Sequence, residues 1–411
     1  MKNIELLAPA GDLEKLKIAV DYGADAVYFG GEMYGLRAGA RNFGIEQIME
    51  GVAYAHMHGR KAYMTLNIFA HNEDIEGLAD YLKSISHIPI DAFIVSDPGV
   101  IETIKENFGD AAIHLSTQAN TTNYKTADFW HRQGVRRIVL ARELSFDEIR
   151  VIRQKTDPGL ELEAFVQGAM CISYSGRCLM SNFMAERDAN RGECAHPCRW
   201  SYHLVEEKRP GEYYPVFEDE RGTYVFNSKD LCMLRHIPEL ADAGITSFKI
   251  EGRMKSVFYV ATIVGAYRKA IDNYLRDPEN YRFDPALMTE IEKVSHRTFT
   301  TGFYFGKPSQ ADQNYLTSSY TREYAFLGLV RSYDEKTGIA VVEQRNKINI
   351  SDEVEVFGPH TDFFTQKIDE MTDEDDQPIE HAPHAQQIVK IRMKQPVKEK
   401  YIIRRKSNEE E

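Results

Sequence analysis

Cysteine is scarce in this 411-residue chain, and its five cysteines are confined to one segment. No apolar run approaches the ~18 residues that a membrane-spanning helix needs, so the sequence predicts no membrane anchor. Residues 1–5 carry no hydrophobic signal-peptide core. An odd number of cysteines without a secretion signal favours reduced thiols, and we therefore expect a cytoplasmic protein.

Two common hydrolase motifs are also missing. Neither H-E-x-x-H nor G-x-S-x-G occurs, so the usual signatures of zinc proteases and serine hydrolases are absent from the sequence. The 13 histidines show no grouping that resembles a metal triad. The formal net charge of −13 disfavours a general attraction for nucleic acid. It leaves room for a local basic groove, because affinity depends on where Lys and Arg lie.

The cysteines that are present are the strongest chemical signal. Cys171, Cys178, Cys194 and Cys198 lie within 28 residues in the order C-x6-C-x15-C-x3-C, and Cys232 follows. Cysteines that only fill a core have no reason to gather, whereas the thiolate ligands of a metal must converge. The pattern predicts a metal or cluster site, with a disulfide pair or an active-site thiol as alternatives.

The spacing leaves the type of metal open. Zinc sites usually contain paired C-x2–4-C motifs, and only Cys194 and Cys198 fit that spacing. Iron–sulfur clusters accept more varied loops and a distant fourth ligand, for which Cys232 is available. The residues therefore favour a cluster, with zinc as the alternative.

The first 300 residues alternate between strand and helix patterns. Several strand patterns are continuous apolar runs, as expected of parallel strands covered on both faces. We predict eight strands, at residues 4–8, 26–29, 61–68, 91–95, 112–116, 136–140, 160–166 and 247–250. Eight strands with intervening helices predict an α/β fold of the (β/α)8 TIM-like barrel type, and a doubly wound open sheet is the alternative.

One interval breaks this rhythm. Strands seven and eight are separated by an insertion, residues 169–234, that holds every cysteine. An insertion there leaves the carboxyl end of strand seven, the face where barrel enzymes place their chemistry. We assign the barrel to residues 1–300, a linker to 301–322, and a small C-terminal all-β barrel domain to 323–406.

Polar side chains follow several predicted strands. Arginines at a barrel mouth suit bidentate binding of carboxylate or phosphate. We therefore treat five residues as candidate substrate ligands, with ion pairs among loops as the simpler alternative: Asn67, Gln118, Arg142, Glu251 and Arg253. The sequence assigns no catalytic residue.

Several segments resemble the signature of the U32 (collagenase-like) peptidase family. The longest is residues 163–181, which contains Cys171 and Cys178. Residues 7–12, 191–199, 227–232 and 249–253 are similar to other blocks of that family. The resemblance spans essentially the whole chain, including the C-terminal β-domain.

The family contains enzymes that hydroxylate RNA or ubiquinone precursors without molecular oxygen. By resemblance these carry a four-iron four-sulfur (4Fe-4S) cluster, and the RNA enzymes depend on prephenate. One barrel with one compact β-domain looks like the branch that hydroxylates carbon 5 of the tRNA wobble uridine. The resemblance implies that four of the five cysteines hold the cluster: Cys171, Cys178, Cys194, and either Cys232 or Cys198.

Three functions are therefore open. The first is a tRNA hydroxylase whose partners are tRNA, prephenate as a small dicarboxylate co-substrate, and a second family member in a hetero-oligomer. In it the mouth arginines hold prephenate, and the lysine-rich segment 390–406 contacts tRNA backbone unless it is a solvated edge. The second is a peptidase, for which the sequence shows no metal-bound water or carboxylate dyad and offers a Cys–His pair using Cys232. The third is a non-catalytic RNA-binding protein with a structural metal.

Overall fold

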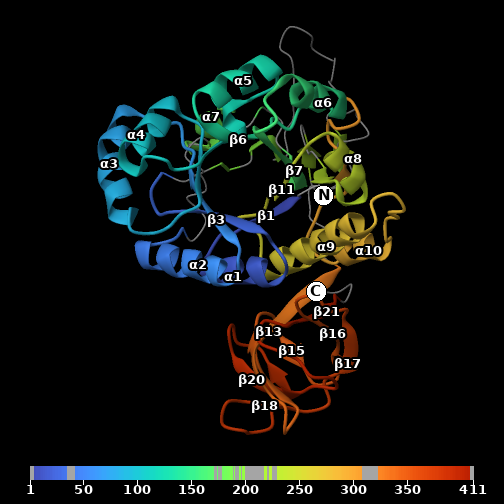
Figure 1. Ribbon diagram of the computed structural model, residues 1–411. Helices are drawn as coiled ribbons and strands as arrows, with labels where there is room; N and C mark the ends of the chain where they lie inside the picture. Colours follow the sequence, from blue (N-terminus) through green and yellow to red (C-terminus); the bar gives the residue numbers. More distant parts are fainter. Residues whose placement is uncertain are drawn as a thin grey trace.

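The computed structural model describes residues 4–34, 42–170, 174, 178–187, 189, 194–195, 197–199, 217–219, 222–224, 229–307 and 323–407. Its larger part is a closed barrel of eight parallel strands ringed by helices (Figure 1). The last barrel strand closes the ring, because Ser247 is in register with Glu5 on one side and with Glu163 on the other. This closure confirms the predicted (β/α)8 barrel and excludes the open sheet.

The order of the elements matches the predicted alternation, with strand ends shifted by a few residues. The barrel strands are β1 (Glu5–Pro9), β2 (Ala26–Gly30), β3 (Lys61–Leu66), β4 (Ala92–Val95), β5 (Ile113–Leu115), β6 (Val135–Val139), β7 (Glu161–Ala169) and β11 (Ser247–Ile250). The surrounding helices are α1 (Leu13–Asp21), α2 (Ile45–Met57), α3 (Asn72–Ile85), α4 (Pro98–Phe108), α5 (Tyr124–Arg132), α6 (Phe146–Lys155), α8 (Ile237–Asp242) and α9 (Val257–Arg276).

Local sequence explains where these elements begin and end. Every residue of β2 and β4 is buried, as expected of strands covered on both faces. The Asp12 carboxylate accepts a hydrogen bond from the Lys15 backbone N–H at 2.9 Å, which is the N-cap predicted for α1. Gly134 follows α5 with φ of 85°, a left-handed conformation that glycine adopts without steric penalty.

The insertion between β7 and β11 adds short elements at one end of the barrel. They are α7 (Met180–Ala185), the 3-10 helices η3 (Pro197–Arg199) and η4 (Leu234–His236), and the strands β8 (Phe217–Asp219), β9 (Gly222–Tyr224) and β10 (Asp230–Cys232). Strand β10 runs antiparallel to the end of β7 and parallel to β12 (Phe299–Thr300). The insertion is therefore joined to the carboxyl end of β7, as predicted.

Residues 323–407 form an antiparallel half-barrel with its own hydrophobic core. Its main sheet has the order β17-β16-β21-β13-β14-β20-β18. These strands are β13 (Tyr324–Asp334), β14 (Ile339–Gln344), β16 (Glu353–Phe357), β17 (Phe364–Lys367), β18 (Met371–Thr372), β20 (Ile388–Arg392) and β21 (Ile402–Lys406). A short second pair joins β15 (Ile348–Asn349) to β19 (His381–Ala382). The fold class is the predicted one, while the domain boundaries, including the linker at 301–322, stay a prediction.

The half-barrel packs against the outside of the barrel, next to α9 and α10 (Ala286–Glu292) (Figure 1). Arg404 on β21 is fully buried there, with ion pairs to Glu290 on α10 and, at 2.7 Å, to Glu355 on β16. Lys293 lies 2.8 Å from the same Glu355 carboxylate. The contact is therefore a specific, charge-compensated interface. In the described part of the chain, no helix is long and apolar enough to cross a membrane.

Replacing Arg404 with alanine is expected to lower the free energy of unfolding by about 3 kcal/mol, since it leaves Glu290 and Glu355 to share Lys293 as their one remaining cation at this interface. Lys269→Ala is the matched control across the same interface. Its ion pair with Asp362 joins side chains that are 50% and 90% exposed, so its loss is expected to change stability by less than ~1 kcal/mol. Urea unfolding of both variants measures the difference, and equal effects would contradict this description of the interface.

Candidate functional site

Buried charges fill the amino-terminal half of the barrel. Arg137 of β6 pairs with Glu5 of β1, with Glu161 and with Glu163 of β7, the last at 3.1 Å. Lys249 of β11 lies 2.7 Å from Glu163. Burial lowers the pKa of Lys249, although the Glu163 carboxylate opposes this shift. These ion pairs link four strands beneath the carboxyl ends of the barrel and hold them in a fixed register.

Acid is expected to weaken this network through Glu5. Burial alone would raise the pKa of Glu5, but the charge of Arg137 and hydrogen bonds from Arg137, Tyr63 and Ser247 hold it below 4.5. The stabilisation by ionised Glu5 is therefore complete above pH 4.5 and is lost as the pH falls through the lower, folded-state pKa. Urea unfolding between pH 7 and pH 3 should show a shallower acid loss for Glu5→Gln than for the wild-type chain. The control is Glu76→Gln, an exposed change on α3, which should lose stability with falling pH as steeply as the wild-type chain. If Glu5→Gln also loses stability as steeply as the wild-type chain, the role assigned to Glu5 is wrong.

Two of the predicted ligands lie together at the carboxyl ends of β3 and β5. The Asn67 side-chain amide donates to Gln118 Oε1 at 2.7 Å and to Ser116 Oγ at 3.3 Å. Gln118 lies in the one-turn helix η1 (Thr117–Ala119) and is 5% exposed. Asn67 Oδ1 is buried and has no hydrogen-bond partner among the described residues. The amide pair therefore keeps an acceptor for a ligand.

Arg253 follows β11 and lies across the mouth of the barrel, which is the end formed by the carboxyl ends of the strands. It points toward the ends of β2 and β3. Its Nη2 donates to Asn42 Oδ1 at 2.8 Å, and its Nη1 lies 3.5 Å from Thr65 Oγ1. Gly30, the last residue of β2, makes the space for this guanidinium, since a Cβ there would lie 2.4 Å from Nη2. Arg253 is 5% exposed, so its orientation is set by the barrel ends and not by solvent.

Arg142 approaches the mouth from the end of β6. Its Nη1 donates to the Ala169 carbonyl oxygen at 2.7 Å, and its guanidinium lies 4.0 Å from the ring centre of Phe165. Its Nε is buried and has no hydrogen-bond partner among the described residues. Arg142 thus keeps a donor beside the carboxyl end of β7.

Glu251 lies where β7 and β11 approach each other. Its backbone N–H donates to the Gln167 carbonyl oxygen at 2.9 Å, and its own carbonyl accepts from the Tyr259 hydroxyl at 3.2 Å. Gly168 has φ of 113°, and a Cβ there would lie 2.8 Å from the Glu251 Cβ. These contacts place Glu251 at the mouth, and its role as a substrate ligand stays a prediction.

The described cysteines lie on the insertion beside this mouth. Cys178 carries a free, half-buried thiol, and Cys194 and Cys198 are also half-buried. Ser181 Oγ on α7 accepts from the Ala195 backbone N–H at 3.0 Å, which brings the segments of Cys178 and Cys194 side by side.

The fifth cysteine of the predicted ligand set is Cys171, which lies outside the described residues. Within those residues, no three His, Cys, Asp or Glu side chains form a group that could hold a metal ion. Four thiols on two adjacent segments and on β10 nevertheless supply the soft donors that an iron–sulfur cluster requires. The chemistry of the donor set fits the cluster, and the ligand assignment stays a prediction.

Cys232 connects the insertion to the barrel. It lies on β10 opposite Gln167 of β7 and is 8% exposed. Burial raises the pKa of its thiol to about 11. The neighbouring Met233 N–H donates to the Tyr267 hydroxyl at 3.1 Å, which fixes this end of β10 against α9. Strand β7 therefore lies between β10, which carries Cys232, and β6, which Arg142 follows.

Several residues of the site were not predicted. Ser116 and Thr65 are ordinary strand residues in the sequence, and only the fold brings them to Asn67 and Arg253. Lys249 carried a signal, because it alternates with Ser247 along β11, and both are polar residues in an otherwise apolar strand. Gly30 ends an apolar strand, but the guanidinium that needs its missing side chain comes from far along the chain.

Comparison with known proteins agrees with this architecture. Residues 11–314 match the profile of peptidase family U32, and residues 322–404 match that of the peptidase family U32 C-terminal domain. The chain is 46% identical over 392 residues to the "tRNA hydroxylation protein P1" of Bacillus subtilis, covering 95% of this chain and 92% of that protein. It is 38% identical to the "tRNA hydroxylation protein P" of Escherichia coli, covering 86% of each. It is also 33% identical to a "Collagenase" of Porphyromonas gingivalis, covering 97% of this chain and 96% of that protein.

Proposed function

We propose that this chain, which belongs to peptidase family U32, hydroxylates carbon 5 of the wobble uridine in tRNA. The observation that carries the proposal is its similarity, over nearly its whole length, to proteins named for tRNA hydroxylation. The barrel mouth supports it, because arginines and amides gather there beside a cysteine-bearing insertion.

The reaction replaces a C5–H bond of the base with a C5–OH bond. This change removes two electrons from the base and adds one oxygen atom. In this proposal the co-substrate balances both: a C–OH bond of the co-substrate breaks, its oxygen passes to C5, and the co-substrate takes up the hydrogen and is reduced by two electrons. A 4Fe-4S cluster, when bound, supplies one-electron redox chemistry. Its ligands in this proposal are Cys171, Cys178, Cys194, and either Cys232 or Cys198. Prephenate is the proposed co-substrate.

Different residues of the mouth suit the two proposed ligands, prephenate and the uracil base. Arg142 and Arg253 suit the two carboxylates of prephenate, because guanidinium and carboxylate form charge-assisted hydrogen bonds. Asn67 and Gln118 suit the uracil edge, which presents an N–H donor between two carbonyl acceptors. The unpartnered Asn67 Oδ1 would accept from that N–H. A uridine must leave its stack to reach these groups, so the base is expected to flip into the mouth.

The second candidate is a peptidase, which the family name and the similarity to a protein named collagenase favour. The nucleophile that the sequence offered for it is Cys232. That thiol is buried, and its raised pKa keeps it protonated at neutral pH, whereas a nucleophilic cysteine needs an accessible thiolate. This observation disfavours a Cys232 peptidase and leaves RNA hydroxylation as the better-supported function.

The proposed reaction implies where the protein acts and with which partner. A tRNA hydroxylase acts where tRNA is found, so we place the protein in the cytoplasm. A second family member is the proposed partner in a hetero-oligomer. Co-purification of the tagged chain from its own cells, followed by mass spectrometry, identifies such a partner if it is present.

A strain lacking this protein tests the function directly. Its tRNA is expected to lose the C5-oxygenated wobble uridine, and expression of the intact chain should restore it. Nucleoside mass spectrometry of purified tRNA measures both results. Unchanged nucleosides in a strain that also lacks any related family member would refute the proposal, and restored peptide cleavage instead would favour the peptidase.

The space made by Gly30 gives a more local prediction. In Gly30→Ala the new Cβ overlaps the Arg253 guanidinium, which must move away from its place at the mouth. We expect the KM for prephenate to rise by roughly 10-fold, which corresponds to the loss of about one charge-assisted hydrogen bond. The midpoint of unfolding should change little. Gly44→Ala is the control, because its Cβ would meet its nearest neighbour, Glu32 Oε1, at 3.6 Å. An unchanged KM for Gly30→Ala would separate Arg253 from co-substrate binding.

A further inference from the structure

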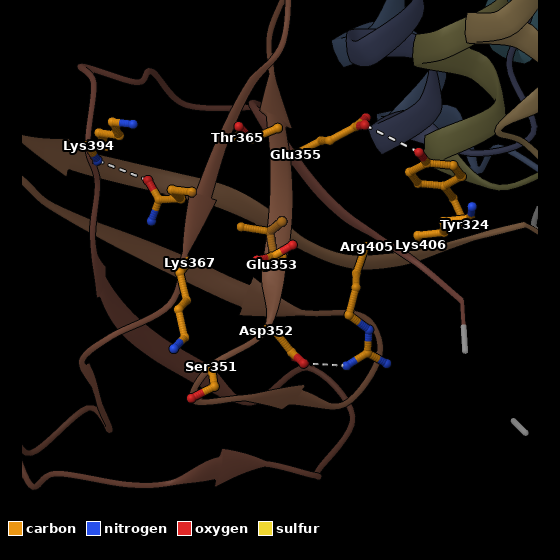
Figure 2. A pocket seen from close by; sticks show the side chains of 12 residues that line it. Tyr324, Ser351, Asp352, Glu353, Glu355, Thr365, Lys367, Lys394, Arg405 and Lys406 are labelled. Carbon is orange, nitrogen blue, oxygen red and sulfur yellow. Dashed lines mark hydrogen bonds and ion pairs between the residues drawn. The ribbon is translucent and has the colours of Figure 1, made fainter. Parts of the chain in front are cut away.

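A polar hollow of about 750 Å³ lies on the half-barrel, away from the barrel mouth. Figure 2 shows side chains from β16, β17 and β21 around it, with Tyr324 at the end nearest the barrel helices. Its remaining lining residues are Ser351, Asp352, Glu353, Val354, Glu355, Thr365, Gln366, Lys367, Lys394, Arg405 and Lys406.

Charge inside the hollow is not balanced. Asp352 is neutralised by Arg405 at 2.7 Å, and Glu355 by Arg404 and Lys293 of the domain interface. Three exposed lysines remain, Lys367, Lys394 and Lys406, and none of them has an ion pair within the described residues. The one acidic side chain left to face them is Glu353. In a chain of net charge −13, this is a local excess of positive charge.

The three lysines come from separate elements. Lys367 ends β17, Lys406 ends β21, and Lys394 follows β20. Strands β17 and β21 flank β16, so the lysines are spread along the hollow and do not converge on one point. A single small anion would leave part of this charge unused. A chain of phosphates could engage all three lysines, with the Ser351 and Thr365 hydroxyls as further donors.

The same sheet face also holds the half-barrel in place. Successive residues of a strand alternate between its two faces, so Arg404 and Lys406 project from one side of β21. Arg404 is buried against α10, whereas Lys406 is exposed two residues later. Glu355 joins the two, because it lines the hollow and also pairs with Arg404 and Lys293 of the interface, so the hollow borders the contact with the barrel helices.

We propose that this hollow binds the phosphate backbone of the tRNA whose uridine enters the barrel mouth. The inference rests on the proposed function for the identity of the RNA. An acidic protein segment is the competing occupant, since β17 is an edge strand. The polar lining favours RNA, because Tyr324 and Val354 are the only aromatic or aliphatic side chains among its residues.

Binding of an unmodified tRNA transcript to the full-length, cluster-loaded protein tests the surface. The combined variant Lys367→Ala, Lys394→Ala and Lys406→Ala is expected to bind at least ~10-fold more weakly at physiological salt. Its plot of log affinity against log salt should be shallower by about two to three, since each lost phosphate contact removes roughly one from the slope. Glu353→Lys should have the opposite effect and strengthen binding.

A matched control removes three exposed lysines of the same half-barrel that do not line the hollow: Lys336, Lys347 and Lys398. Their replacement by alanine makes the same change in net charge, and it should leave tRNA affinity within about twofold. Fluorescence anisotropy of labelled tRNA over a salt series measures all variants, and thermal unfolding confirms that each is folded.

The outcomes separate this inference from the proposed reaction. If the hollow variant binds and modifies tRNA like the wild-type chain, the surface assignment is wrong and the hydroxylase proposal stands. If the hollow variant loses binding but the wild-type chain forms no hydroxyuridine, the surface assignment stands and the reaction is wrong. A wild-type chain that binds no tRNA, or a hollow variant that loses only an acidic protein partner, would overturn the inference.

Discussion

A Cys178→Ala variant purified without oxygen is expected to contain almost no iron or acid-labile sulfide, whereas the wild-type chain should contain about four of each. The reason is that a 4Fe-4S cluster needs four thiolates, and the half-buried Cys178 offers one on the segment that Ser181 holds against Ala195. Hydroxylation of tRNA should fall to background at the same time. Metal analysis and the absorption spectrum measure the first loss, and nucleoside mass spectrometry measures the second.

One control and two further cysteine variants make this result interpretable. Phe183→Ala removes a highly exposed side chain from α7 without touching a thiol, and it should keep its iron. Cys198→Ala and Cys232→Ala then identify the fourth ligand, because only one of the two is expected to lose the cluster. Full iron content in Cys178→Ala would remove Cys178 from the ligand set, and stoichiometric zinc in the wild-type chain would replace the cluster by a zinc site.

Replacing Arg253 with alanine is expected to reduce kcat/KM for prephenate by roughly 100-fold. Loss of charged hydrogen bonds to a carboxylate costs about 3 kcal/mol, and each 1.4 kcal/mol is about one factor of ten. Arg253→Lys should recover only a small part, because an ammonium cannot reproduce the planar fork that Asn42 and Thr65 orient. Steady-state kinetics with prephenate varied at saturating tRNA measures this effect.

Arg142→Ala should give a smaller loss, since its Nη1 is already engaged by the Ala169 carbonyl oxygen. Arg150→Ala is the control, because that side chain is 41% exposed on α6 and pairs with Asp147. A loss confined to kcat, with an unchanged KM for prephenate, would contradict a binding role for Arg253. In that case the guanidinium would serve only to hold the ends of β2 and β3.

Much of the barrel was predictable because its strands are nearly continuous apolar runs separated by capped helices. Asp12, which caps the start of α1, and Gly134, which follows the end of α5, are examples of such helix ends. Each acts only on neighbours within a few residues, so the sequence alone reveals it. Because the strands could be located in the sequence, the residues that follow their carboxyl ends could be named as well. This predicted that Asn67 and Gln118 lie at the same end of the barrel. The two side chains come into contact because β3 and β5 both pair with β4, one on each side.

What the sequence did not predict depends on contacts between distant segments. Arg404 gives no sign that it will be buried, because the carboxylates that compensate it come from α10 and β16. The basic hollow was anticipated only as a lysine-rich segment at 390–406. Of that segment, Lys390 is neutralised by Asp376, Lys400 by Asp21, and Arg405 by Asp352. Lys367, which completes the hollow, lies outside that segment, and only the pairing of β16 with β17 reveals it.

The most direct test of the central claim is an anaerobic reaction of the purified, cluster-loaded chain with unmodified tRNA and prephenate, followed by nucleoside mass spectrometry. The wobble uridine is expected to gain one oxygen atom, the product should require prephenate, and Cys178→Ala should form none. Unmodified tRNA in the presence of an intact cluster and prephenate, together with cleavage of a denatured collagen substrate by the same preparation, would contradict it.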